Sequence, residues 1–264
     1  MKILFFGDIV GKISRRAIKE VLPKLKEEYS PDLVIANAEN AAHGIGVTEN
    51  IIRELQEAGI DFFTSGDHIF DKPDGVNLVS ATKPVIIRPA NYPAGVRGVG
   101  YRVIEVGSRK VLIINLIGRV FMKRDFDCPF RKLDEILQQV KVESLSAIIL
   151  DFHAEATSEK GAMGWYADGR VSAVLGTHTH VPTADARILP GGTAFVSDVG
   201  MVGATDSIIG DKKEPIINSF LHQLPMQLDI PEEGEVFVGA VLVEVDPRTR
   251  QAISFERLDR TIRV

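Results

Sequence analysis

The sequence contains almost no cysteine. Cys128 is the single cysteine among 264 residues, which excludes an internal disulfide and a metal cage built from thiolates. No apolar run approaches the roughly 20 residues that a membrane-spanning helix needs. Neither sign of charge dominates, since 31 Lys and Arg stand against 36 Asp and Glu. The net charge of −5 indicates no broad basic surface for nucleic acid.

The amino-terminal stretch MKILFFGDIVGK is apolar but short, and it lacks a small-residue cleavage site. We therefore interpret it as a first strand and not as a signal peptide, and we expect a cytoplasmic protein. A chain of this length can bury a substantial core. No low-complexity linker or internal repeat divides it, which predicts a single domain over residues 1–264.

Short apolar runs alternate with helical patterns in the first quarter of the chain. Strands are predicted at residues 2–7, 32–37 and 61–66, with a helix over 14–28 between the first two. Thr48 is a candidate N-cap for a second helix. This strand–helix–strand rhythm favours a parallel sheet with both faces covered.

From residue 85 onward the pattern changes to strands that follow one another closely. The segments PVIIRP, GYRVIEVG and KVLIINLIG predict adjacent strands, and a helical pattern returns at 131–141. Buried strands are predicted at 145–155 and 170–180, and two antiparallel strands around the turn at Asp246 and Pro247. The whole pattern predicts an α/β protein with two packed sheets and helices outside.

Polar side chains follow five of the predicted strands at or near their carboxyl ends. They are Asp8, Glu39, Asn40, Asp67, His68, His153, His178 and His180. Taken singly, each is as readily a turn, capping or core residue. In a parallel sheet, however, these strand ends share the edge where ligands bind. Oxygen and imidazole donors without thiolate suit Mn, Fe, Zn or Mg, and their number suits two ions better than one.

The segment GTHTHVPT places two histidines one residue apart after an apolar run. In an extended strand, His178 and His180 would point to the same face. Each could then serve one of two ions roughly 3.5–4 Å apart. Such a site also needs a bridging carboxylate, for which Glu39 is the natural candidate. It further needs an open position for a water that becomes hydroxide near neutral pH.

The order of these motifs resembles a known family. Asp8, then NAEN, GDH, His153 and GTHTH resemble the calcineurin-like metallophosphoesterases, most of all their YmdB-like bacterial branch. The resemblance extends over essentially the whole chain, including FFGDIVG at the start and SDVGM at residues 197–201. It implies a four-layer αββα sandwich. It also implies a phosphodiesterase that acts on 2′,3′-cyclic nucleotides.

The resemblance further implies two divalent ions, Fe or Mn in the first place and Mg or Zn as alternatives, with Glu39 as their shared ligand. The other ligands of the first ion would be Asp8, Asn40 and His180. The other ligands of the second ion would be Asp67, His153 and His178. His68 would be the general acid that protonates the leaving oxygen.

Two positions depart from the pattern of the wider superfamily. Val10 stands where a histidine usually follows the first aspartate, a departure that the YmdB-like branch shares. Asp67 stands where the family normally has asparagine, in a GNH motif. An aspartate can still bind a hard cation, but it adds a negative charge to the predicted site.

Several further residues are candidates for supporting roles. Asp71 either orients His68 or caps a helix that begins near Pro73, and we favour the cap. Asp198 is a candidate for supporting the site from behind. The remaining candidates are His43 in a loop near the mouth of the site, His222 on a helix as a structural residue, and Arg88 and Asn91 as either phosphate contacts or structural pairs.

Three other functions stay open on the sequence alone. A phosphomonoesterase or nucleotidase could use the same fold, and a non-catalytic relative could bind metal as a regulatory module. The candidate general acid His68 argues against the second of these. Metal-dependent amidohydrolase barrels also carry a His-x-His pair, but there it typically follows the first strand and here it follows a late one. Homo-oligomers are compatible with the sequence.

Overall fold

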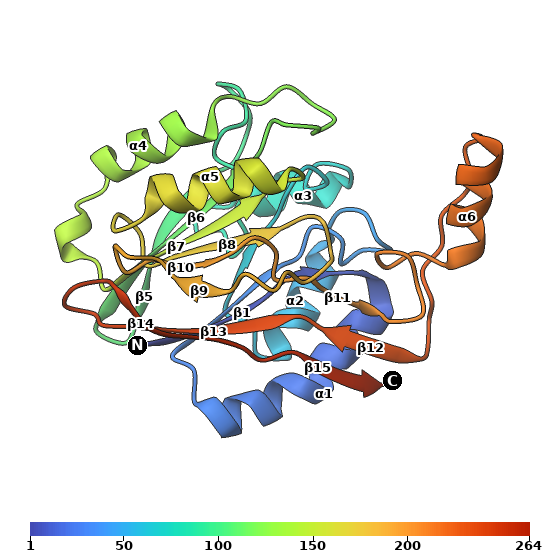
Figure 1. Ribbon diagram of the computed structural model, residues 1–264, viewed down its shortest axis with the longest axis horizontal. Helices are drawn as coiled ribbons and strands as arrows, with labels where there is room; N and C mark the ends of the chain where they lie inside the picture. Colours follow the sequence, from blue (N-terminus) through green and yellow to red (C-terminus); the bar gives the residue numbers. More distant parts are fainter.

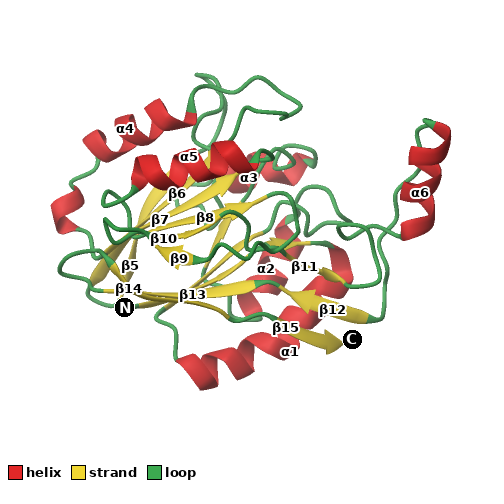
Figure 2. Cartoon of the chain, in the orientation of Figure 1, coloured by secondary structure: helices red, strands yellow, loops and turns green.

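The computed structural model describes residues 1–264 and contains three hydrogen-bonded sheets (Figures 1 and 2). The first has the order β14-β13-β1-β3-β4, with β14 (Ala252–Arg257), β13 (Ala240–Val245), β1 (Lys2–Phe6), β3 (Leu33–Asn37) and β4 (Phe62–Thr64). The second has the order β5-β6-β7-β8-β10-β9, with β5 (Tyr101–Val106), β6 (Arg109–Ile117), β7 (Ala147–His153), β8 (Ala173–Thr177), β10 (Ala194–Val196) and β9 (Arg187–Ile188). The third has the order β15-β12-β11-β2, with β15 (Arg260–Arg263), β12 (Glu235–Val238), β11 (Met201–Ala204) and β2 (Asp8–Ile9).

Six α-helices connect and cover these strands. They are α1 (Gly11–Tyr29), α2 (Glu49–Glu57), α3 (Pro73–Ser80), α4 (Pro129–Gln139), α5 (Thr157–Ala167) and α6 (Lys213–His222). The predicted N-cap of the second helix is confirmed, because the Thr48 hydroxyl accepts a hydrogen bond from the Ile51 amide at 3.4 Å. None of the helices is long and apolar enough to span a membrane.

Alternation of side chains along the central strands creates separate cores. On β1, Leu4 and Phe6 pack toward helices α1 and α2, whereas Ile3 and Phe5 pack against the second sheet. On β6, Ile113 faces the first sheet while its neighbour Leu112 faces α4 and α5. Figure 1 shows α1 and the pair α4 and α5 on opposite sides of the strands. The predicted four-layer αββα sandwich is therefore confirmed.

The third sheet was not predicted from the sequence, and it continues the first. The chain runs from β1 into β2 through Gly7, and from β12 into β13 through Gly239. The Gly7 amide donates to the Gly239 carbonyl at 3.1 Å, which joins the two strand pairs where they change direction. A Cβ at Gly7 would overlap the carbonyl oxygen of Gly200, so only glycine fits this crossing.

One predicted strand is wrong. The apolar run PVIIRP forms only an isolated bridge between Ile86 and Phe63 and does not continue as a strand. Prolines at both ends of the run remove backbone donors that a longer ladder would need. The other predicted strands and helices are present, with ends that differ by a few residues. Figure 1 also shows α6 standing away from the sandwich, and none of its residues is buried.

Candidate metal centre

The parallel strands of both sheets end at one place. Asp8 follows β1, Glu39 and Asn40 follow β3, and Asp67 and His68 follow β4. From the second sheet, His153 is the last residue of β7, and His178 comes directly after β8. The predicted convergence of polar strand ends is therefore what the structure contains, with side chains arriving from two facing sheets.

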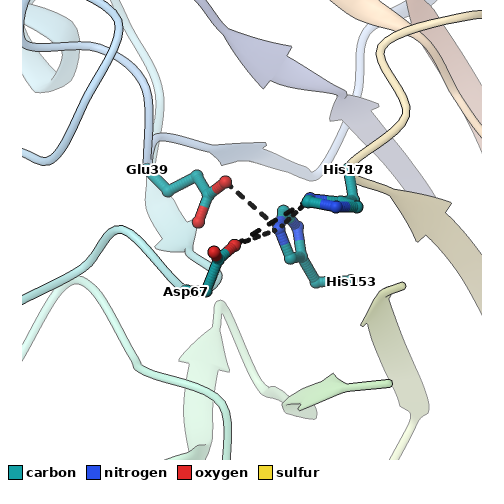
Figure 3. A group of neighbouring side chains, drawn as sticks. All are labelled: Glu39, Asp67, His153 and His178. Atoms are coloured by element: carbon teal, nitrogen blue, oxygen red, sulfur yellow. Dashed lines mark hydrogen bonds and ion pairs between the residues drawn. The ribbon is translucent and has the colours of Figure 1, made fainter. Parts of the chain in front are cut away.

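Four of these side chains form a compact cluster (Figure 3). Glu39, Asp67, His153 and His178 each offer a ligand atom, and these atoms lie within 4.8 Å of one another. The Nε2 of His153 lies 3.1 Å from Glu39 Oε1 and 3.4 Å from Asp67 Oδ1. The Nδ1 of His178 lies 3.0 Å from that same Nε2. These residues could hold a metal ion.

The remaining predicted ligands lie beside this cluster. Asn40 Nδ2 is 3.1 Å from His180 Nε2 and 3.4 Å from Glu39 Oε1. Asp8 Oδ1 is 4.0 Å from His180 Nε2 and 3.8 Å from His153 Nδ1. Glu39 and Asp8 each lie near side chains of both groups, and Glu39 is the closer of the two to His153.

The explanation given above for the His-x-His spacing is wrong. His178 and His180 do not lie in an extended strand, because β8 ends at Thr177. Both residues have positive φ angles of 98° and 64°, in the left-handed region. The turn aims His178 at the Asp67 cluster and His180 at Asp8 and Asn40. The two rings therefore diverge, and each joins a different ligand group.

Hydrogen bonds behind the histidines orient each ring. His153 Nδ1 lies 3.0 Å from the Thr177 hydroxyl, which in turn donates to the Asp151 carboxylate at 2.7 Å. His180 Nδ1 donates to the Ile209 carbonyl at 2.6 Å. In both His153 and His180 the donor is Nδ1, which leaves Nε2 free to face the cluster. The role of Asp151 could not be predicted from the sequence, because an aspartate inside an apolar run carries no indication of its partners.

The residues fit a bound cation. The buried side-chain atoms without a hydrogen-bond partner are Asp8 Oδ1, Asn40 Oδ1, Asp67 Oδ1 and the Tyr92 hydroxyl, so three of the four belong to predicted ligands. Buried polar atoms normally find partners, and a cation would supply one to all three oxygens. A Cβ added at Gly66 would overlap Glu39 Oε2 and His153 Nε2. The absence of a side chain at Gly66 thus leaves room for these two candidate ligands to approach each other.

The charges in the cluster shift the pKa values of its members. Burial favours neutral His153, but Glu39, Asp67 and Asp8 outweigh it and raise the pKa of His153 well above its ordinary value. Burial and the charge on His153 lower the pKa of His178 to about 4. Burial alone would raise the pKa of Asp67, yet its contacts with His153 hold it well below its usual range. Without a cation, a proton on His153 balances the carboxylates.

His68 lies at the edge of the cluster with a carboxylate behind it. Its Nδ1 donates to Asp71 Oδ2 at 2.7 Å, and Arg124 lies 3.4 Å from the other oxygen of Asp71. The favoured reading of Asp71 as a helix cap is therefore wrong, since Lys72 is the N-cap of α3 and makes no side-chain cap. Burial lowers the pKa of His68, but Glu39 and Asp71 raise it above the ordinary value overall.

A cavity of about 540 Å³ opens beside the cluster. His68, His178 and His180 line it, and so does His43, which was expected near the mouth of the site. The lining also includes the segment 227–232, which follows α6 in the chain. Nothing in the composition of that segment pointed to the site, so sequence reasoning missed it.

Four other candidates have structural partners or none. Arg88 donates to the carbonyls of Arg97, Pro89 and Val96, and Asn91 to those of Ile117 and Asp127, so neither is free for a phosphate. His222 is exposed at the end of α6. Asp198 lies directly behind the turn that carries the two histidines and bonds its central residue, Thr179.

Comparison with known proteins identifies the family. A family model described as YmdB-like protein matches residues 4–258. The chain is also 45% identical over 258 residues to the 2′,3′-cyclic-nucleotide 2′-phosphodiesterase of Bacillus subtilis, covering 98% of this chain and 96% of that protein. The chain belongs to the YmdB-like family. The resemblance drawn from the sequence motifs is thereby confirmed.

Solved structures agree with this membership. A hypothetical protein from Thermus thermophilus matches with a TM-score of 0.92 and 39% identity over 99% of both chains. A structure described as a novel phosphatase from Mycoplasma pneumoniae also has a TM-score of 0.92, with 36% identity over 99% of this chain and 93% of the other. The NAD nucleotidase of Haemophilus influenzae shares the fold of this YmdB-like chain at 16% identity and a TM-score of 0.56, covering 100% of this chain and 56% of the other.

Proposed function

We propose that this protein is a phosphodiesterase that hydrolyses 2′,3′-cyclic nucleotides with two divalent metal ions, Fe or Mn in the first place. The observation that carries the proposal is the set of buried oxygens without partners, on Asp8, Asn40 and Asp67, which surround imidazole nitrogens beside a cavity. The printed name of the Bacillus subtilis relative supports the substrate class.

Each candidate ligand has a role in the proposal. One ion would be held by Asp8, Glu39, Asn40 and His180, and the other by Glu39, Asp67, His153 and His178. When bound, the ions would supply Lewis acidity and an activated water near neutral pH. Sites that combine imidazole and carboxylate donors are typical of Fe and Mn. Mg or Zn would also suit these donors.

His68 would hold the proton that the leaving oxygen needs. Its Nδ1–H donates to Asp71, so the ring is fixed with Nε2 available at the wall of the cavity. Its raised pKa favours the protonated ring near neutral pH. A proton delivered at Nε2 would stabilise a departing sugar hydroxyl, which is a poor leaving group in its ionised form.

The cavity volume of about 540 Å³ is within the range of roughly 300–1,000 Å³ that small-molecule sites have. A cytoplasmic location is part of the proposal, since 2′,3′-cyclic nucleotides arise where RNA strands are cleaved by their own 2′-hydroxyls. We also propose that residues 1–264 act as one domain, because the ligands come from strands between Asp8 and His180 in both sheets.

A substrate panel tests the proposal. Purified protein loaded with Mn²⁺ or Fe²⁺ is offered 2′,3′-cyclic nucleotides, a generic phosphodiester and nucleoside monophosphates, and products are identified by chromatography. Rapid opening of the cyclic ester to a nucleoside 3′-phosphate is the expected result. Release of inorganic phosphate from monoesters alone would favour the phosphatase activity named for the Mycoplasma pneumoniae structure. Full metal occupancy without any hydrolysis would contradict both.

A further inference from the structure

The turn that carries His178 and His180 is not a relaxed conformation. Both histidines have φ in the left-handed region, at 98° and 64°, where residues with a Cβ are disfavoured. Each ring reaches its own ligand group only because of this backbone geometry. A turn of this kind keeps its shape when its surroundings determine it.

The residue between the histidines is fixed by one carboxylate oxygen. Asp198 Oδ2 accepts from the Thr179 amide at 3.1 Å and from the Thr179 hydroxyl at 2.6 Å. The same oxygen accepts from Lys160 Nζ at 2.6 Å. Its partner oxygen, Asp198 Oδ1, accepts from the Gly200 amide at 2.8 Å. Thr179 is therefore tied to Asp198 through both of its donors.

Lys160 and Asp198 form an ion pair inside the protein. Their side chains are 1% and 0% exposed, and Lys160 enters from α5, on the outer face of the second sheet. A buried ion pair is a poor source of stability, because the loss of hydration offsets the attraction between the charges. Replacing such a pair by apolar side chains of similar volume is often neutral or stabilising. A contribution to stability therefore does not account for this pair.

We propose that Lys160 and Asp198 are positioning residues, which hold Thr179 so that His178 and His180 point into the two ligand groups. Lys160 holds the Asp198 carboxylate in place, and that carboxylate fixes the strained turn. The inference rests on the proposed function in one respect, namely that the two histidines bind metal. It adds that the affinity for metal is set in advance by a pair that touches neither ion.

The double variant Lys160→Met with Asp198→Leu separates positioning from stability. It removes both charges together, so neither is left buried without its partner. The amides of Thr179 and Gly200 lose their acceptor, so a lower melting temperature is expected, and metal affinity is compared at a temperature where both proteins are folded. The affinity of the double variant for Mn²⁺, measured by calorimetry on metal-free protein, should fall by about 10–100-fold, as is usual when a group that orients ligands is lost. At saturating Mn²⁺, we expect kcat to recover in part while KM for the phosphodiester changes little.

Two variants at Thr179 provide the conservative comparison. Thr179→Ser keeps the hydroxyl that Asp198 accepts from and should bind Mn²⁺ like the wild type. Thr179→Val keeps the shape but not the hydroxyl, and should bind Mn²⁺ less tightly. Asp168→Asn is the matched control, because Asp168 accepts hydrogen bonds from the Gly191 and Thr193 amides and makes none with Asp198 or the histidine turn.

The outcomes are distinct. Wild-type Mn²⁺ affinity in both the double variant and Thr179→Val would overturn the positioning role and leave the proposed function intact. An equal loss in Asp168→Asn would also overturn it, since the effect would then not be specific to the support of the histidine turn. Absence of Mn²⁺ binding in the wild-type protein itself would overturn the proposed function together with this inference.

Discussion

The Nε2 of His153 and the Nδ1 of His178 face each other at 3.0 Å, with Asp67 Oδ1 3.4 Å from the first nitrogen and 3.9 Å from the second. The other nitrogen of each ring has a partner of its own, the Thr177 hydroxyl for His153 and Glu155 for His178. In the metal-free protein one proton must lie between two nitrogens that would otherwise both present lone pairs.

Replacing the shared carboxylate, Glu39, should cause the largest loss of turnover. Glu39→Gln should lower turnover by more than about 100-fold, because a neutral amide no longer balances the charge of two adjacent cations. Metal analysis should find fewer than two ions per chain. Glu155→Gln, which changes a carboxylate at the outer nitrogen of His178, should have a smaller effect. Near-normal turnover with full metal content in Glu39→Gln would refute the shared-ligand role.

The general acid should matter most for poor leaving groups. His68→Ala should slow hydrolysis of a 2′,3′-cyclic nucleotide by roughly 10²–10⁴-fold. A nitrophenyl phosphodiester, whose leaving group needs little protonation, should be slowed far less. Steady-state rates on both substrates at saturating metal provide the measurement. Equal losses on the two substrates would instead indicate a metal-binding or structural role for His68.

The negative charge at position 67 should tighten metal binding. Asp67→Asn should weaken Mn²⁺ affinity by at least about tenfold, since a unit charge at 4 Å is worth about 4 kcal/mol at an effective dielectric of 20, before solvent rearrangement reduces it. Asp134→Asn removes the same charge from a surface pair with Arg170 and should leave the titration unchanged. Identical curves for Asp67→Asn and the wild type would exclude Asp67 as a ligand.

A single methyl group should close the metal site. Gly66→Ala places a Cβ on Glu39 Oε2 and His153 Nε2, so it should abolish metal binding and activity without changing any charge. Gly161→Ala is the control, because a Cβ there meets nothing within 4 Å in helix α5. That change should stabilise the protein by up to about 1 kcal/mol. Stoichiometric metal in Gly66→Ala would show that the cation sits elsewhere.

The metal-free protein should become less stable as the pH rises. The pKa of His153 lies well above its ordinary value in the folded chain, so the folded state holds a proton that the unfolded state releases near pH 6.5. The resulting stabilisation is complete below pH 6.5 and is lost as the pH rises through the raised pKa. Denaturant titrations of chelator-treated protein between pH 6 and 9 test this. His153→Gln should flatten the profile, and an unchanged slope in that variant would assign the proton to another group.

The sequence predicted most of the fold because its apolar runs are unambiguous. Strands such as β3 and β7 are continuous buried segments, and the polar residues at their ends stood out against them. The prediction of a strand at PVIIRP was wrong. Its composition is typical of a strand, but its two prolines cannot donate the backbone hydrogen bonds that join neighbouring strands. The prediction that His178 and His180 lie in an extended strand was wrong for another reason. No local sequence pattern distinguishes an extended pair of histidines from a pair in a left-handed turn.

The burial of Lys160 could not be predicted from the sequence. A lysine on a helix is almost always solvated, so nothing in the segment SEKGAMGW predicts that this one is buried against Asp198. The same holds for the segment 227–232, whose place on the cavity wall depends on the path of the chain after α6. Both features depend on contacts between parts of the chain that are distant in sequence, so only the folded structure shows them.

The two sheets contribute chemically different halves of the centre. Every oxygen donor, on Asp8, Glu39, Asn40 and Asp67, follows a strand of the first sheet, whereas the imidazoles of His153, His178 and His180 come from the second. Neither half has a complete donor set, so a bound ion would join two layers that otherwise meet through an apolar core and a few buried polar contacts, such as the Asn37 amide with Asp151 at 3.0 Å. During refolding, tight metal uptake would therefore report the moment when the sheets dock in register, later than the formation of either sheet.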